Sequence, residues 1–430
     1  MKRILFFFLI SFLFSSCVWI PQLGSSSLKE KTTIQSFNDV NDPFVFELKA
    51  YERFNLMGSS EDKGNSNHCI GELFVVYDWE NESIIDNLYV PDVNRNIGVS
   101  ETLNSMKASD GSLNFYSYSY NGNRLYKLNS KNCGTDGIQR ISLTDFNDIY
   151  TNGIVNSVYS DAPNILYFYR TGYDFEKSCT LGEIRIITAG SDVISEPIPF
   201  ETYSDLNSRF CRIIPDYAGD YWLSYEVKED ERYRLSSVIR KINVRENKLE
   251  EPLLIFDNHE GAVYDEMDGW NKVSHTYVLY GNAEGLIVAR DFYKKYRLEN
   301  QKLYYIDIAT KSISEFTASD EMTLTNLVNY SDCIATVNGK TYLVSYDIKG
   351  EYPDNRYEWS VYEIDISGKQ LSKVVTFNNP DLRGFSSLKV RENRIYIFYE
   401  IDSDVVFTSF DTVSNSFSDV KTISVNDFIK

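Results

Sequence analysis

The chain has 430 residues, of which 43% are hydrophobic and 15% aromatic, enough for a packed globular body. It carries 62 acidic against 43 basic side chains, a formal net charge of −19. The field of such a chain repels phosphate backbones and anionic lipid headgroups, so nucleic acid is excluded as an expected partner. The acidic residues are spread along the chain, which favours a solvated acidic surface over one acidic binding tract.

The N-terminus has the pattern of an export signal. Met1-Lys2-Arg3 is basic, and the apolar run from Ile4 to Phe14 is too short to span a bilayer. Ser15-Ser16 then precede Cys17. This arrangement resembles the lipobox of bacterial lipoproteins, in which the cysteine is acylated and becomes the mature N-terminus. Phe14 departs from the usual aliphatic residue, as in the relaxed lipoboxes of spirochaetes and some Bacteroidetes.

The lipobox resemblance implies a lipoprotein of the bacterial cell envelope, held on the outer membrane or the periplasmic side by palmitate or similar chains on Cys17. More than one acyl chain is needed for stable anchoring. We predict a signal peptide over residues 1–16, the lipidated cysteine and a polar tether over 17–42, and one globular domain over 43–430. A plain secretory signal with an incidental cysteine is the alternative.

A unit of two alternating strands joined by a short turn recurs about every 50 to 60 residues, which is typical of blades around an axis. Asn, Ser, Gly, Lys and Asp fill the turns. The seven copies are Glu72–Trp79 with Ser83–Val90, Asn123–Asn129 with Gly137–Leu143, Gly182–Ala189 with Val193–Phe200, Ser236–Val244 with Lys248–Phe256, Lys302–Ala309 with Ser312–Thr317, Ser360–Ile366 with Gln370–Phe377, and Val405–Asp411 with Phe417–Val425.

Each later copy follows another pair of apolar runs with a tight turn, such as Asn282–Gly285 or Asn338-Gly339. This pattern predicts an all-β, seven-bladed β-propeller of four-stranded antiparallel blades. A sandwich or a tandem of small β domains is the alternative. Ser386–Val425 supplies all four strands of the last blade. The first blade is expected to form its four strands within Thr32–Tyr89, without a strand from the last blade. Closure of the ring should therefore depend on apolar packing between the first and last blades.

The connections predict one face with minimal turns and one with long loops, and binding residues concentrate in loops on a rigid scaffold. We use the name long-loop face for the end that carries the second-to-third and blade-to-blade connections. Its predicted excursions are Phe54–Ile70, Pro91–Ser109, Thr171–Leu181, Asp257–Lys272, Ala318–Asp332 and Lys349–Trp359.

These loops are rich in aromatic rings among acids, as in Tyr173-Asp174-Phe175, a composition that suits sugar faces or a protein partner. Rings folded back onto the blades are the alternative. Basic residues near the predicted channel mouth could instead form an anion site, with Lys272 and the acidic Asp332 nearby, unless each pairs with a neighbouring acid. The candidate ligand-binding residues are Trp270, Trp359, Tyr264, Tyr357, Arg209, Arg212, His275 and Arg383.

Five cysteines remain besides Cys17. Cys179 and Cys211 fall on the same face of adjacent blades, and export permits oxidation, so we predict a disulfide between them. Cys69, Cys133 and Cys333 are expected to be small buried or idle thiols.

No nucleophile or metal motif stands out: His68, His259 and His275 are scattered, and Asp265, Glu266 and Asp268 lack the pattern of a calcium loop. No cofactor or metal is expected. By architecture the mature chain resembles bacterial lipid-anchored β-propellers, which include assembly scaffolds. We therefore predict a monomeric binding or scaffold lipoprotein that engages a protein partner or glycan. The alternative is a carbohydrate-active enzyme, a hydrolase or lyase, with its site at the channel mouth.

Overall fold

The computed structural model describes residues 42–55, 65–91, 101–103, 105–107, 110–119, 124–129, 139–142, 150–156, 164–188, 193–204, 206, 210–216, 219–265, 269–295, 297–318, 333–349, 356–379, 387–401 and 404–428. The predicted signal peptide, Cys17 and nearly all of the tether lie outside the described residues. Within the described ranges there is no helix long and apolar enough to cross a membrane.

The described residues form seven sheets of four or five strands and one two-stranded hairpin. The first sheet holds β1 (Phe44–Asn55), β2 (Asn65–Asp78), β3 (Ser83–Pro91) and β4 (Glu101–Leu103). The second holds β5 (Ser105–Lys107), β6 (Leu113–Ser119), β7 (Arg124–Asn129) and β8 (Gln139–Ser142). The third holds β9 (Tyr150–Asn156), β10 (Asn164–Asp174), β11 (Cys179–Thr188), β12 (Val193–Ile194) and β13 (Ile198–Thr202).

The fourth sheet holds β14 (Arg212–Pro215), β15 (Tyr221–Lys228), β16 (Leu235–Asn243), β17 (Lys248–Leu249) and β18 (Leu254–Asp257). The hairpin β19 (Tyr264–Asp265) and β20 (Gly269–Trp270) precedes the fifth sheet of β21 (Lys272–Gly281), β22 (Gly285–Lys294), β23 (Arg297–Asp307) and β24 (Ile313–Glu315). The sixth holds β25 (Thr317–Ala318), β26 (Ile334–Val337), β27 (Lys340–Lys349), β28 (Arg356–Asp365) and β29 (Gln370–Asn378). The seventh holds β30 (Ser387–Arg391), β31 (Arg394–Ile401), β32 (Asp404–Asp411), β33 (Ser416–Phe417) and β34 (Lys421–Ser424), followed by a 3-10 turn, η2 (Val425–Asp427).

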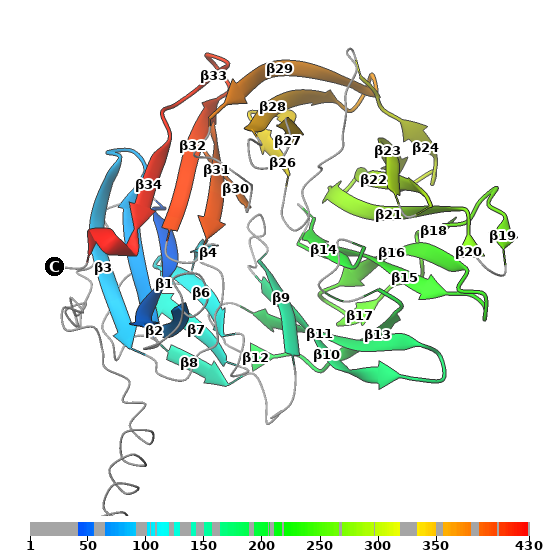
Figure 1. The fold of residues 1–430 in the computed structure, drawn as a ribbon, viewed down its shortest axis with the longest axis horizontal. Coiled ribbons are helices and arrows are strands. Elements are labelled where there is room, and N and C mark those ends of the chain that lie inside the picture. The colour runs from blue at the N-terminus through cyan, green and yellow to red at the C-terminus, as the bar shows by residue number, and fades with distance from the viewer. Residues whose placement is uncertain are drawn as a thin grey trace, which may run out of the picture.

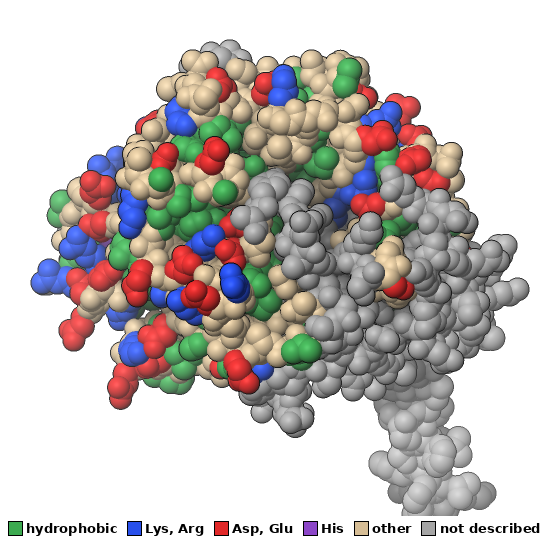
Figure 2. Space-filling view, turned by 180° about the vertical axis from the view of Figure 1, so that it is seen from behind, with side chains coloured by type: hydrophobic (Ala, Val, Ile, Leu, Met, Phe, Trp, Pro, Cys, Tyr) green, Lys and Arg blue, Asp and Glu red, His purple; other side chains and the backbone are tan. Residues whose placement is uncertain are grey.

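The sheets succeed one another around a common centre, so the all-β propeller prediction is confirmed (Figure 1). Strands pair antiparallel within each sheet, except that β25 runs parallel to β29 and so links the edges of the fifth and sixth sheets. The blade count of the whole chain stays a prediction. Acidic and basic side chains are interspersed over the face in Figure 2, as expected for a solvated surface.

Each predicted two-stranded unit is an antiparallel pair on the outer side of one sheet. The turns repeat one local design. In the hairpin after β32, Asp411 accepts hydrogen bonds from the backbone N–H groups of Val413 and Ser414, and Asn415 has a positive φ of 54°. Asp365 with Lys369 and Asn243 with Asn247 repeat this arrangement. Short Asp and Asn side chains suit such turns because they satisfy the local backbone.

The first sheet departs from the prediction. Its innermost strand is β4, which pairs with β1 although it follows the outer strand β3 in the chain. The prediction that the first blade completes itself within Thr32–Tyr89 is therefore wrong. The alternating-pattern signal missed β4 because a strand of three residues is too short to show a period of two.

The first and seventh sheets lie side by side and close the ring through apolar packing (Figure 1). Phe46 lies 5.7 Å from Phe398 and 5.8 Å from Phe407, measured between ring centroids. Among the described strands, none from the first sheet pairs with one from the seventh. Closure by packing, without an exchanged strand, is confirmed for the described residues.

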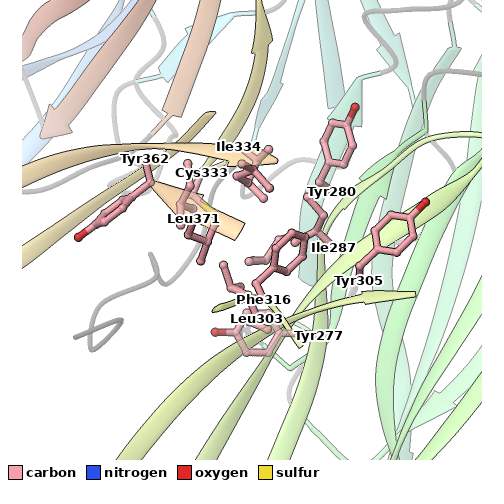
Figure 3. Packing of buried hydrophobic residues seen from close by; sticks show 14 residues of the cluster. Tyr277, Tyr280, Ile287, Leu303, Tyr305, Phe316, Cys333, Ile334, Tyr362 and Leu371 are labelled. Carbon is pink, nitrogen blue, oxygen red and sulfur yellow. The ribbon is translucent and has the colours of Figure 1, made fainter. Parts of the chain in front are cut away.

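The other interfaces between sheets are built in the same way. Between the fifth and sixth sheets, Tyr277, Leu303 and Phe316 face Cys333 and Leu371 across the junction (Figure 3). Cys333 is fully buried, in agreement with its expected role as a small packing thiol. The body of the propeller therefore consists of apolar seams between rigid sheets, which hold the connecting loops in fixed positions.

Candidate functional site

Two of the predicted excursions on the long-loop face contain less loop than the sequence predicts. β10 and β11 extend through most of Thr171–Leu181 and leave only the four-residue turn Phe175–Ser178. Asp257–Lys272 contains the hairpin β19–β20. In these two segments the long-loop face is therefore formed by extended β-hairpins and not by long irregular loops.

Trp359 was a candidate ligand contact, and this prediction is wrong. It lies within β28, not in a loop, and its side chain is fully buried in the seam between the sixth and seventh sheets. Its ring centroid is 5.1 Å from that of Tyr346. Tyr357, also on β28, is half-buried and packs against the same Tyr346 at 5.6 Å. A ring buried between sheets cannot reach a ligand on the surface.

Trp270 and Tyr264 face each other across the hairpin β19–β20, with ring centroids 5.2 Å apart. The indole Nε1 of Trp270 donates a hydrogen bond of 2.8 Å to the carbonyl of Arg232, and the ring lies 4.4 Å from His259. Trp270 is half-buried and ties this hairpin to the tip of β15–β16. The alternative reading, rings folded back onto the blades, therefore describes Trp270 better than a free ligand contact.

The predicted basic group at the channel mouth is only partly described. Arg209, Arg383 and Asp332 lie outside the described residues. Arg212 is buried in β14, whereas Lys272 at the start of β21 is exposed. Among the described candidates at this position, His275 takes part in a built polar cluster.

His275 is held by Glu226, a carboxylate that the sequence analysis did not single out. The two lie on neighbouring sheets, in β21 and β15, with Nδ1 2.5 Å from Oε1. Glu226 also accepts hydrogen bonds from Ser204 Oγ and, at 2.7 Å, from Asn258 Nδ2. The imidazole stacks on Phe210 at 4.0 Å. Because a carboxylate accepts, Nδ1 carries the proton, and among the described residues no group is hydrogen-bonded to Nε2.

A groove of about 310 Å³ lies beside this cluster, where the third sheet meets the fourth. Three segments line it: the tip of β10–β11, the end of β13, and the tip of β15–β16. The lining residues are Glu176, Lys177, Cys179, Glu201, Thr202, Tyr203, Val227, Lys228, Glu229, Asp230 and Glu231.

Aromatic side chains from the same hairpins flank the groove. Phe175 is 86% exposed at the tip of β10–β11 and lies 5.1 Å from Tyr173. Tyr233, 50% exposed, lies 6.1 Å from Tyr203. Burial raises the pKa of Tyr203, with smaller contributions from Tyr233 and Tyr173, so Tyr203 is a neutral phenol at physiological pH.

The sequence predicts an aromatic, acidic loop at Tyr173-Asp174-Phe175, and this segment lies on one side of the groove. It predicts neither the groove nor its other side. Glu201 and the run Glu229-Asp230-Glu231 belong to hairpins of different sheets. The charged run that follows β15 is visible in the sequence. That it lies beside the tip of β10–β11 follows only from the three-dimensional arrangement of the sheets.

The predicted disulfide between Cys179 and Cys211 is wrong. Both are buried thiols, and neither forms a disulfide. Cys179 begins the third strand of its sheet, whereas Cys211 precedes the first strand of the next sheet. Burial raises the pKa of the Cys179 thiol, and Glu201, 4.0 Å from the sulfur, adds to this effect.

No group of three or more His, Cys, Asp or Glu side chains in the described part of the chain could hold a metal ion. No family model matches the chain, and a search of curated proteins also found no match.

Solved structures do resemble it. The β-propeller domain of the Trilobed protease from Pyrococcus furiosus is 14% identical, with a TM-score of 0.41 over 91% of this chain and 93% of that one. The Dos1 propeller is 11% identical, with a TM-score of 0.41 over 92% and 88%. The polysaccharide lyase Uly1 is 10% identical, with a TM-score of 0.40 over 79% and 83%. Such likeness concerns the propeller fold alone and carries no argument about ligands.

Proposed function

We propose that this protein is a membrane-anchored binding or scaffold protein that engages a protein partner or glycan through the long-loop face. The observation that carries the proposal is the set of exposed rings, Phe175, Tyr173 and Tyr233, around a groove between two rigid hairpins. Large exposed apolar rings lower the solubility of a protein, and groups of them on a surface commonly mark interaction sites. Aromatic side chains are also enriched at binding surfaces.

The test replaces Phe175 and Tyr233 together by Ser and measures capture of partners from native membranes and binding to a glycan array. Both side chains lie at hairpin tips, so the fold should survive and binding should fall at least tenfold. Val413→Ser is the matched control, because Val413 is 72% exposed on the opposite, short-turn face. Equal binding by the double variant and the control would overturn the proposal.

The membrane anchor is part of the proposal and is supported by the lipobox-like sequence that ends at Cys17. Acylation would add about 0.8 kcal/mol of membrane affinity per buried methylene group, so two or more chains would hold the protein firmly. The tether would let the propeller stand away from the bilayer.

Replacing Cys17 by Ser should release the protein from the membrane fraction and abolish labelling by a fatty-acid probe, without a change in the unfolding transition. Cys133→Ser, which removes a cysteine remote from the lipobox in sequence, should keep both. Membrane association that survives Cys17→Ser, together with no labelling of the parent, would leave an ordinary exported protein instead.

A second candidate, a carbohydrate-active enzyme, is favoured by the Glu226–His275 pair. The buried carboxylate orients the imidazole and leaves Nε2 available as a general base. If the protein is an enzyme, turnover on a polysaccharide panel should fall by at least 100-fold in His275→Gln and in Glu226→Gln, and persist in the control His259→Gln. Absence of turnover in the parent across hydrolase and lyase substrates would exclude this candidate.

A further inference from the structure

We propose that the groove between the third and fourth sheets binds a cationic side chain, so that the partner is a protein segment rich in Arg or Lys. The inference rests on the proposed binding role of this face and narrows the partner from protein or glycan to a basic peptide. Charge, an unsatisfied hydroxyl, the flanking rings and the size of the groove each support it.

The groove has more negative than positive charge of its own. Five of its lining residues are carboxylates and two are lysines. Lys177 is already paired with Glu201 at 2.7 Å, and Lys228 lies over the ring of Tyr233 at 4.0 Å. Among the described residues, Glu176, Glu229 and Glu231 take part in no ion pair. Arg234 lies close enough to Asp230 and Glu229 to offset part of their charge. An excess of carboxylates around a concave site attracts cations.

Thr202 provides an observation that is independent of charge. It is fully buried where β13 ends, and it lines the groove. Its Oγ1 has no hydrogen-bond partner in the described structure. A buried hydroxyl oxygen without a partner costs free energy that a ligand N–H group would recover. Ammonium and guanidinium groups carry several such donors and no acceptor.

The flanking rings already bind cations within the chain. Besides the Lys228 ammonium over Tyr233, the Arg170 guanidinium lies 5.7 Å from the centroid of Tyr173. These contacts show that the rings near the groove hold positive groups over their faces. Phe175, exposed at the tip beside Tyr173, offers a further ring to an incoming Arg or Lys.

The size of the groove favours side chains over an extended ligand. A volume of about 310 Å³ lies at the lower limit of small-molecule sites, which run from about 300 to 1,000 Å³. It suits one or two long side chains from a segment that crosses the two hairpins, rather than a bound oligosaccharide chain.

The test uses the full chain in detergent and fluorescence anisotropy with a labelled peptide of alternating Gly and Arg. A peptide of equal length with Gln in place of Arg is the reference ligand. We expect the Arg peptide to bind at least tenfold more tightly. Equal binding of the two peptides would overturn the proposal.

Two matched triple variants distinguish the effect of the groove carboxylates on peptide affinity from the effect of the net charge of the protein. The groove variant carries Glu176→Gln, Glu229→Gln and Glu231→Gln. The control carries Glu80→Gln, Glu284→Gln and Glu392→Gln, three exposed acids in short turns on the opposite face. Both lose three negative charges. We expect at least a tenfold loss of Arg-peptide binding in the groove variant and less than a twofold loss in the control; equal losses would show a non-specific field and refute the site.

Thr202→Val tests the hydroxyl group separately, because this substitution leaves the charge of the groove unchanged. It keeps the shape and removes the hydroxyl, so Arg-peptide affinity should fall a few-fold with the unfolding transition unchanged or raised. If the Phe175/Tyr233 double variant loses its partner while neither peptide binds the parent, the binding role stands and the cationic ligand does not.

Discussion

His259 is buried where the chain leaves the fourth sheet, between the ring of Trp270 and the backbone of Lys272, whose carbonyl lies 3.4 Å from Nδ1. Its Nε2 has no partner among the described groups. Burial lowers the pKa of this imidazole below its ordinary value, because the charged form would lose its hydration. His259 is therefore neutral in the folded state at pH 7.

The buried neutral imidazole predicts acid sensitivity. The unfolded chain binds a proton on His259 below about pH 6.5, whereas the folded chain resists it until the lower folded pKa, so the free energy of unfolding falls as the pH drops through this window. In His259→Gln, the loss of stability between pH 7.5 and 5 should be smaller than in the parent, as measured by urea unfolding at each pH. An identical pH dependence in the two proteins would contradict this.

At the residue scale, the sequence identified segments rich in aromatic side chains but not which of these side chains are exposed to a ligand. Phe175 and Trp359 both occur in segments that looked like acidic, aromatic loops. Trp359 is buried because β28 begins at Arg356, and the residues of a strand alternate between the two faces of the sheet. Phe175 is exposed because it occupies the turn between β10 and β11. An error of a few residues in a strand boundary thus separates a core residue from a ligand contact.

At the element scale, Gly182 and Phe200 show how the third sheet is packed. They are paired across β11 and β13, and a Cβ atom at position 182 would lie 2.7 Å from the Phe200 ring. The phenyl ring thus covers the glycine backbone and joins the seam with the fourth sheet through Tyr225, 6.1 Å away.

Gly182→Ala should therefore lower the free energy of unfolding by about 1 to 3 kcal/mol through overpacking. In the Phe200→Leu background the ring atoms that clash are absent, so the same change should cost less. Urea unfolding of the four proteins in a double-mutant cycle measures the coupling. Additive effects would show that the ring does not approach the glycine this closely.

Elements with strong local signals were predictable from the sequence. The outer strand pairs were located because alternation and Asp or Asn turns mark each one independently. β4 and the hairpin β19–β20 were not, since strands of two or three residues have no period. The Glu226–His275 pair and the groove could not be predicted from local sequence patterns, because each consists of residues from neighbouring sheets.

At the scale of the whole molecule, the ring is closed by side chains and not by backbone pairing. Polar contacts border the apolar seam: the Arg391 guanidinium lies 3.0 Å from the Asp42 carboxylate and 4.9 Å from the Phe44 ring centroid, and Lys421 pairs with Glu82. The Lys421–Glu82 pair is largely exposed to solvent and so adds little. The aromatic cluster of Phe46, Phe398 and Phe407 must supply most of the closure energy.

Phe46→Ala is accordingly expected to open the ring. The side chain is fully buried at the seam, so its removal should lower the free energy of unfolding by about 3 to 5 kcal/mol. Hydrogen exchange followed by mass spectrometry should show faster exchange in both β1–β2 and β31–β32, which are far apart in sequence, with little change in β22–β23. Leu303→Ala, which leaves a cavity in the seam between the fifth and sixth sheets, should give the opposite distribution. If Phe46→Ala loosened only the first sheet and left β31–β32 protected, the closure would have to depend on contacts other than this cluster.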